Sequence, residues 1–241
     1  MNTNNFGSRN VARLIGALFL AGFLFYGVGF GLVTSVIGAP DLIATISAHQ
    51  TILVVGAFLM LLNTVVDVGK AVLFFPILEN HGKRTALTYL AMLIVEVVLL
   101  DVGVVGLLMI APLAQLSLDA GQASAGWAQA MGQFLVQWNA MAYQIAQMSL
   151  GFGCLFLFAL LFRIRLIPRF LSIWGLIGYA ILMTGALAEI FGIHIGLVLS
   201  LPGGLFEVAL GLWLLIKGFG AVAYQPMTRR RDDPVAVMTT A

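Results

Sequence analysis

The basic residues of this chain are grouped in four short clusters that are separated by long apolar runs. Positive charge in every second loop is what the positive-inside rule predicts for a six-helix membrane protein with both termini in the cytoplasm. The intervening connections at 38–50, 117–128 and 191–197 contain no Lys or Arg. The clusters hold eleven of the twelve Lys and Arg residues: Arg9 and Arg13, Lys83 and Arg84, Arg163, Arg165 and Arg169, and Lys217 with Arg229, Arg230 and Arg231.

The composition favours the same fold class, an all-α, polytopic integral membrane bundle. The chain is 61% hydrophobic and 9% charged, with a mean hydropathy of +1.04, whereas soluble domains contain roughly 25% charged residues. A water-soluble protein of this size could not bury so much apolar surface, so we expect the lipid bilayer as the solvent. The net charge of +2 does not indicate a nucleic-acid partner, because the basic residues lie at helix ends and form no groove.

The apolar runs predict six spans in one membrane domain over residues 1–241. The first run, about 14–37, is too long for the apolar region of a signal peptide and is interpreted as a retained span. A short external turn with one helical turn of its own is expected at 38–50. The polar, basic tail at 224–241 is expected to be disordered. The spans are expected at about 12–37, 51–77, 86–112, 140–162, 170–191 and 197–219.

The segment before the fourth span carries five glutamines on one predicted helical face, at positions 129, 133, 137, 144 and 147. Their steps of four, four, seven and three match helical periodicity. Trp127, Phe134 and Trp138 lie elsewhere around this helix. The fourth helix is therefore expected to begin as an amphipathic segment at the outer membrane surface, where tryptophan is favoured.

Ionisable residues inside the spans are the candidates for function, because each costs a few kcal/mol in the bilayer and usually faces a protein interior or a wet cavity. The topology places Glu96 and Glu207 near mid-membrane, Asp101 further out, and Glu189 at the outer surface. These depths make Glu96 and Glu207 the candidates for a proton or cation site.

Asn63, Asp67 and Lys70 share one face of the second span, at i, i+4 and i+7. The spacing of Asp67 and Lys70 allows a direct ion pair. Two interpretations stay open. Asp67 either neutralises a structural lysine that extends toward the headgroups, or the pair forms a gate or an anion anchor on the cytoplasmic side.

Glu207 lies on a glycine stripe of the sixth span, formed by Gly204, Gly211 and Gly218 at seven-residue intervals. Small residues let a neighbouring helix approach closely, so Glu207 is expected to face the protein. We expect it to be protonated at neutral pH or to share a proton with Glu96. A structural hydrogen bond between helices is the alternative.

Asp101, Gln144, Gln147 and Glu189, together with His194, are candidates for an outward-open polar cavity. No sequence motif indicates a metal site, a cofactor or a catalytic nucleophile. The three histidines, His49, His81 and His194, lie in loops or at helix ends, and no nucleophile elbow or phosphate-binding loop is present. We therefore assign no catalytic residue and no metal ligand.

Two stretches, RLIPRFLSIWGLIGYAILMTG (165–185) and LPGGLFEVALGLWLLIKGF (201–219), resemble the bacterial membrane family catalogued as domain of unknown function 4386. DVGKAVLFFPIL (67–78) is similar as well, and the resemblance covers about residues 10–220. It implies a six-span protein of the bacterial cytoplasmic (inner) membrane. It brings no substrate, reaction or catalytic residue with it.

Three functional classes remain open from the sequence. The first is a small proton- or cation-linked transporter that uses Glu96 and Glu207, with an ion or a small molecule as its substrate. The second is a structural, sensory or accessory membrane protein without turnover. The third is an intramembrane enzyme that acts on a lipid or isoprenoid near Asp101, Glu189 and His194. Assembly into a homo-oligomer is compatible with all three, and the sequence favours a protein that is not an enzyme.

Overall fold

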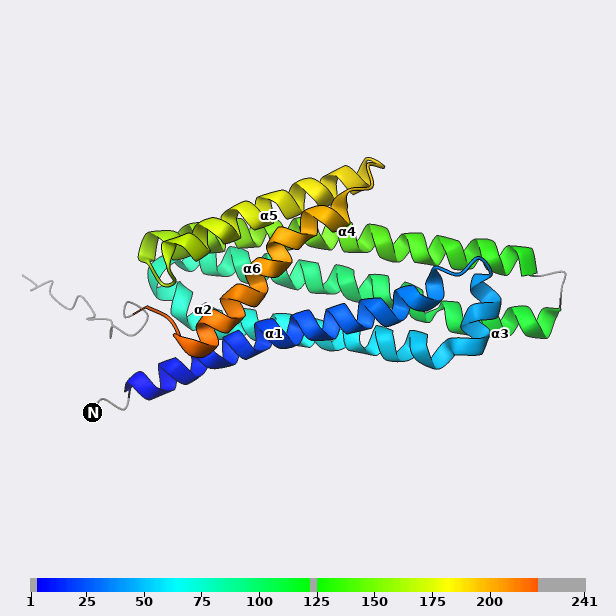
Figure 1. Ribbon diagram of the computed structural model, residues 1–241, viewed down its shortest axis with the longest axis horizontal. Coiled ribbons are helices and arrows are strands. Elements are labelled where there is room, and N and C mark those ends of the chain that lie inside the picture. Colours follow the sequence, from blue (N-terminus) through cyan, green and yellow to red (C-terminus); the bar gives the residue numbers. More distant parts are fainter. Residues whose placement is uncertain (1–3, 122–124, 221–241) are drawn as a thin grey trace, which may run out of the picture.

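A computed structural model describes residues 4–121 and 125–220 of the chain, which form six helices and no strand (Figure 1). Five of the helical segments are long and apolar enough to cross a membrane. The all-helical membrane bundle expected from the sequence is therefore confirmed, whereas the tail at 224–241 lies outside the described residues. The helices are α1 (Asn4–Ile37), α2 (Leu42–Leu108), α3 (Ile110–Ala120), α4 (Ala125–Ile164), α5 (Arg169–Ile190) and α6 (Gly196–Ile216).

The helix α2 contains two of the spans expected from the sequence, because it folds back on itself. Its backbone leaves helical geometry at His49 (φ −128°, ψ 31°) and at Gly82 (φ −176°, ψ 76°). Figure 1 shows the chain reversing direction in this helix, so that residues 50–81 form a first arm and residues 83–108 a second arm. The second arm passes into α3 at Met109, whose backbone stays near helical geometry (φ −69°, ψ −14°) and whose amide donates to the carbonyl of Val105 (3.0 Å). Pro112 has no N–H to bond to the carbonyl of Leu108, yet the apolar helical segment continues to Ala120.

The connection between α1 and α2 is shorter than expected. Asp41 caps α2, since its carboxylate accepts a hydrogen bond of 3.0 Å from the amide of Ala44, as acidic N-cap residues commonly do. Residues 42–48 are consequently helical, before the bend at His49. The side chain of Gln129 on α4 secures this corner, donating to the carbonyl of Pro40 (3.1 Å) and accepting from the amide of Ile43 (3.3 Å).

The described basic clusters meet at one end of the bundle, which we call the basic end. The start of α1, the reversal in α2, the α4–α5 connection and the end of α6 all lie there (Figure 1). The opposite end of the bundle, which we call the far end, contains the α1–α2 corner, the last turn of α3 and the first turn of α4. The α5–α6 connection lies only part of the way along. With 40 residues, α4 is about 60 Å long, roughly twice the hydrocarbon thickness.

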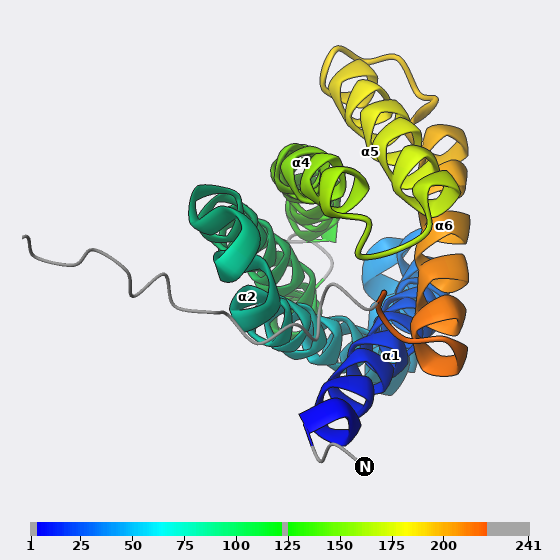
Figure 2. The same cartoon turned by 90° about the vertical axis from the view of Figure 1, so that its left-hand side faces the viewer.

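Glycines allow α1 to approach its neighbours closely. A Cβ atom at Gly16 would lie 2.6 Å from the carbonyl oxygen of Gly211 on α6, and one at Gly29 would lie 2.6 Å from that of Gly56 on α2. Helices in a membrane associate through such close packing, since no hydrophobic effect drives them together. Gly204 and Gly211 of the predicted glycine stripe therefore face α1, whereas Gly218 lies beyond the last residue of α6, Ile216. Figure 2 shows α1 and α6 crossing.

Candidate functional site

A cavity of about 500 Å³ lies inside the bundle, enclosed by α1, both arms of α2, α4, α5 and α6. It gathers side chains that are distant in the sequence and that would each be costly to expose to lipid. Most of the polar candidates identified from the sequence line it: Asn63, Asp67, Lys70, Glu96, Gln144, Gln147, Glu189 and Glu207.

One wall of the cavity carries a buried polar chain on the first arm of α2. Nζ of Lys70 lies 2.5 Å from Oδ1 of Asp67, and Oδ2 of Asp67 accepts a 2.7 Å hydrogen bond from Nδ2 of Asn63. The ammonium group also lies 4.5 Å from the centre of the Phe19 ring, a distance at which an aromatic face attracts a cation. Both oxygens of Asp67 are thus engaged, and its charge is matched by that of Lys70.

Glu207 of α6 also lines the cavity, and its Oε1 accepts a hydrogen bond of 2.5 Å from the hydroxyl of Tyr179 on α5. Glu96 lies on the second arm of α2 and is only 2% exposed, yet its Oε2 has no hydrogen-bond partner. No hydrogen bond joins Glu96 to Glu207 within the described residues, so a directly shared proton is not seen. Of these two carboxylates, Glu207 has a tyrosine partner and Glu96 has one oxygen without a partner.

Glu189 lies at the rim of the cavity, at the end of α5. Its Oε1 accepts a hydrogen bond from the amide of Gly196 (2.8 Å) and its Oε2 lies 2.9 Å from Nδ1 of His194. The His194 side chain is 84% exposed and does not belong to the cavity lining. These contacts connect the last turn of α5 to the first turn of α6, which gives Glu189 a structural role at the α5–α6 connection.

Asp101 does not line the cavity, unlike the other candidates for the outer polar site. It lies five residues after Glu96 on a helix, which turns it by about 140° from the Glu96 side. Its Oδ1 is buried without a hydrogen-bond partner. The adjacent turn packs on α4 instead, where a Cβ atom at Gly103 would lie 2.9 Å from Nδ2 of Asn139.

Sequence reasoning missed the aromatic character of the cavity. All four tyrosines of the described residues line it: Tyr26, Tyr89, Tyr143 and Tyr179. Tyr26 and Tyr143 stack at 5.8 Å between ring centres. A tyrosine hydroxyl inside a span needs a polar neighbour or water, so four tyrosines within spans were the available signal. Cys154 is buried and also lines the cavity.

The cavity is closed toward the basic end and reaches exposed positions toward the far end. The lining residues nearest the basic end include Phe19, Lys70 and Leu157. One helical turn beyond them, toward the basic end, the bundle is filled by three fully buried side chains, those of Ile15, Phe74 and Leu161. In the other direction, Gly27 and Phe30 of α1 line the cavity and are exposed. A Cβ atom at Gly27 would meet nothing within 4 Å, so space is available beside this position.

The comparison with known families gives one match. The family described as domain of unknown function DUF4386 matches residues 14–218. The chain belongs to this family. No curated protein and no solved structure matches it. The matched region of this DUF4386 protein contains every candidate site residue identified above.

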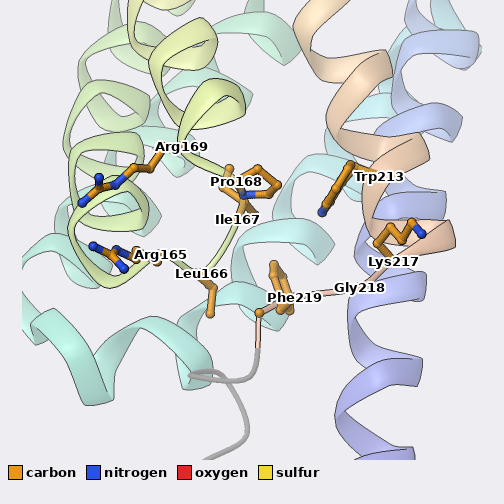
Figure 3. A pocket seen from close by; sticks show the side chains of 10 residues that line it. Arg165, Leu166, Ile167, Pro168, Arg169, Trp213, Lys217, Gly218 and Phe219 are labelled. Atoms are coloured by element: carbon orange, nitrogen blue, oxygen red, sulfur yellow. The ribbon is translucent and has the colours of Figure 1, made fainter.

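The DUF4386 chain has a second, smaller hollow of about 380 Å³ at the basic end, shown in Figure 3. Arg165 and Arg169 lie on one side of it, and Trp213 and Lys217 of α6 on the other. The backbone of Arg165 has a φ of 55°, uncommon for a residue with a side chain, and the amide of Gly220 donates to the carbonyl of Leu166 (2.7 Å). This hollow is basic and separate from the carboxylate-lined cavity.

No group of three or more His, Cys, Asp or Glu side chains suited to a metal ion occurs in the described part of the chain. The cavity carboxylates come from the two arms of α2 (Asp67 and Glu96), from α5 (Glu189) and from α6 (Glu207).

Proposed function

We propose that this DUF4386 protein is a cation-linked transporter of the bacterial cytoplasmic membrane, with six spans, both termini in the cytoplasm, and Glu96 and Glu207 as the residues that hold the cation or the proton. The two arms of α2 serve as separate spans in this proposal. The observation that carries it is an interior cavity in which carboxylates outnumber basic groups.

The charge inventory of the cavity favours a cation. Lys70 is the one basic side chain among the described residues that line it, and Asp67 already lies in contact with Lys70. Glu96 and Glu207 therefore have no ionic partner of their own in contact. A buried carboxylate in this situation either takes up a proton or attracts a positive ion, because an isolated negative charge is costly in a low dielectric.

Protons and cations would then compete for the same two carboxylates. Such competition couples the two species, since binding of one lowers the occupancy of the other. The cavity reaches exposed positions of α1 such as Gly27 and Phe30, and fully buried side chains such as Phe74 and Leu161 close it toward the basic end. Release toward the basic end would require these helices to separate, and the glycine contacts of α1 with α2 and α6 provide small residues where helices can slide.

A structural role without turnover is the main alternative, and the cavity argues against it. A structural interior is expected to be dry and fully paired, whereas here Glu96 lines a cavity of about 500 Å³ and its buried Oε2 has no hydrogen-bond partner. An enzyme is less well supported, because Glu189 and His194 bind each other at the α5–α6 connection and Asp101 lies outside the cavity.

Transport is tested with purified protein in liposomes that contain a pH-sensitive dye. A cation gradient is applied for a panel of inorganic and organic monovalent cations, and the change in internal pH is followed. We expect wild-type protein to couple at least one cation to a pH change, and Glu96→Gln and Glu207→Gln to abolish it. Glu79→Gln, which changes an exposed carboxylate away from the cavity, should behave as wild type. Identical traces from wild-type and protein-free liposomes across the panel would refute the proposal.

A further inference from the structure

We infer that the cavity binds an organic cation that combines a positively charged nitrogen with an aromatic or apolar body, and that this cation reaches Glu96 from the far end. The inference rests on the proposed function only in using the same cavity. It adds the class of ligand, which can be tested without transport.

The size of the cavity suits an organic molecule better than a single ion. Pockets for drug-sized ligands are typically about 300–1,000 Å³ and mostly apolar with a few placed polar groups. The volume here is about 500 Å³, and the described chain gathers no group of metal-ligating side chains. A bare inorganic ion would leave most of this space unfilled.

The walls of the cavity provide aromatic faces beside the carboxylates. Tyr26 and Tyr143 form a stacked pair at 5.8 Å, and both are half-buried. Phe158 and Tyr179 also stack, at 5.6 Å, but they are almost fully buried and serve as packing behind this wall. Aromatic faces attract alkylammonium groups, and recognition of such groups commonly uses aromatic side chains around the charge. The cavity already contains one example, because the ammonium of Lys70 lies 4.5 Å from the centre of the Phe19 ring.

Glu96 supplies the charge that would select a cation. It is only 2% exposed, it lines the cavity, and its Oε2 has no hydrogen-bond partner. A buried carboxylate oxygen without a partner is rare in folded proteins and calls for an explanation. A ligand nitrogen that occupies the cavity would supply the missing positive partner, while Lys70 remains engaged with Asp67.

The inference is tested by binding of benzyltrimethylammonium to the purified full chain. Its neutral counterpart, neopentylbenzene, has nearly the same shape with carbon in place of the charged nitrogen. We expect saturable binding of the radiolabelled cation that excess unlabelled cation displaces and neopentylbenzene does not. Absence of saturable binding, or equal displacement by the neutral compound, would overturn the inference.

The location of binding is tested through Cys154, the one cysteine of the chain, which lines the cavity. Its modification by methyl methanethiosulfonate is followed by mass spectrometry. At a cation concentration ten times the Kd, we expect the modification rate to fall about tenfold, because about a tenth of the cavities remain empty. Saturable binding together with an unchanged Cys154 rate would place the cation elsewhere and contradict the inference. If the thiol does not react even without ligand, the variants described next decide.

Three variants connect binding to the named residues. Glu96→Gln should raise the Kd about tenfold, since it removes a charged partner, and Tyr143→Leu should raise it about fivefold through loss of an aromatic face. Gly27→Trp should block access, whereas Gly31→Trp is the matched control, because it has equally free space but does not line the cavity. Equal affinity in wild type, Glu96→Gln and Gly27→Trp would overturn the inference.

The results separate this inference from the proposed function. Binding without any coupled pH change in liposomes would keep the organic-cation site and reject transport. A pH change driven only by inorganic cations, with no saturable benzyltrimethylammonium binding, would keep transport and reject the organic ligand.

Discussion

The hydroxyl of Tyr179 on α5 lies 2.5 Å from Oε1 of Glu207 on α6. This hydrogen bond connects two neighbouring helices inside the bundle, beside the cavity. It shows why Glu207 can be accommodated there at all, since a buried carboxylate requires a donor. It also leaves Glu96, on the second arm of α2, as the cavity carboxylate with an unpaired oxygen.

Removing this hydrogen bond should destabilise the protein. Tyr179→Phe keeps the ring but leaves Oε1 of Glu207 without its donor, and we expect a loss of about 1–3 kcal/mol, measured as a lower midpoint of thermal unfolding in detergent. Combining Tyr179→Phe with Glu207→Gln should cost less than the sum of the two single changes. Tyr89→Phe, another buried cavity tyrosine, is the control. An unfolding midpoint for Tyr179→Phe equal to that of the control would show that the hydrogen bond contributes nothing measurable.

The ion pair on the first arm of α2 gives a second prediction. Asp67→Asn leaves the Lys70 ammonium buried without its partner, and breaking such a pair typically costs about 3–5 kcal/mol. Adding Lys70→Met should restore part of the stability, because the double variant buries no unpaired charge. The measurement is the unfolding midpoint of the two single variants and the double variant. Strictly additive effects would mean that the two side chains do not interact.

Two glycines of α1 form a matched pair for the packing of the bundle. Gly29 faces the carbonyl of Gly56, where an added Cβ atom would lie 2.6 Å from the oxygen, whereas Gly31 has free space. Gly29→Val should therefore force α1 away from α2 and cost about 1–3 kcal/mol, and Gly31→Val should change little. Thermal unfolding and the yield of folded protein are the readouts. Equal behaviour of the two variants would contradict the close approach at Gly29.

The sequence predicted the fold class and most helices, because long apolar runs and clustered basic residues are direct consequences of the bilayer. Its errors are at the connections. Asp41 and Gln129 make the α1–α2 corner mostly helical through contacts between segments far apart in the sequence.

For the candidate site, helical periodicity predicted which side chains share a face but not which helices face one another. Asn63, Asp67 and Lys70 are on one helix, so their common face follows from spacing alone. That Glu96, Glu207 and four tyrosines enclose one cavity depends on how five helical elements pack. The same limit explains why Asp101 was wrongly grouped with the cavity residues. Its position on the helix relative to Glu96 follows from the sequence, but the helices that pack against it do not.

The orientation of the bundle gives a further prediction. With Cys154 replaced by Ala, single cysteines at His49, Asp119 and His194 should react with a membrane-impermeant thiol reagent in intact cells. Cysteines at His81 and Lys217 should react only after permeabilisation. All five positions are exposed in the fold, so a failure to react reports the membrane side and not burial. Labelling at His81 in intact cells would reverse the proposed orientation.

The measurement that tests the account most directly is the infrared difference spectrum of protonated carboxyl groups during a pH titration in lipid nanodiscs. If Glu96 and Glu207 exchange protons in the cavity, a protonated-carboxyl band of the wild type should lose part of its amplitude in Glu96→Gln and another part in Glu207→Gln. It should stay unchanged in Glu79→Gln. Spectra that are identical in all four proteins would contradict the account, because the cavity carboxylates would then hold a fixed protonation state and serve structure alone.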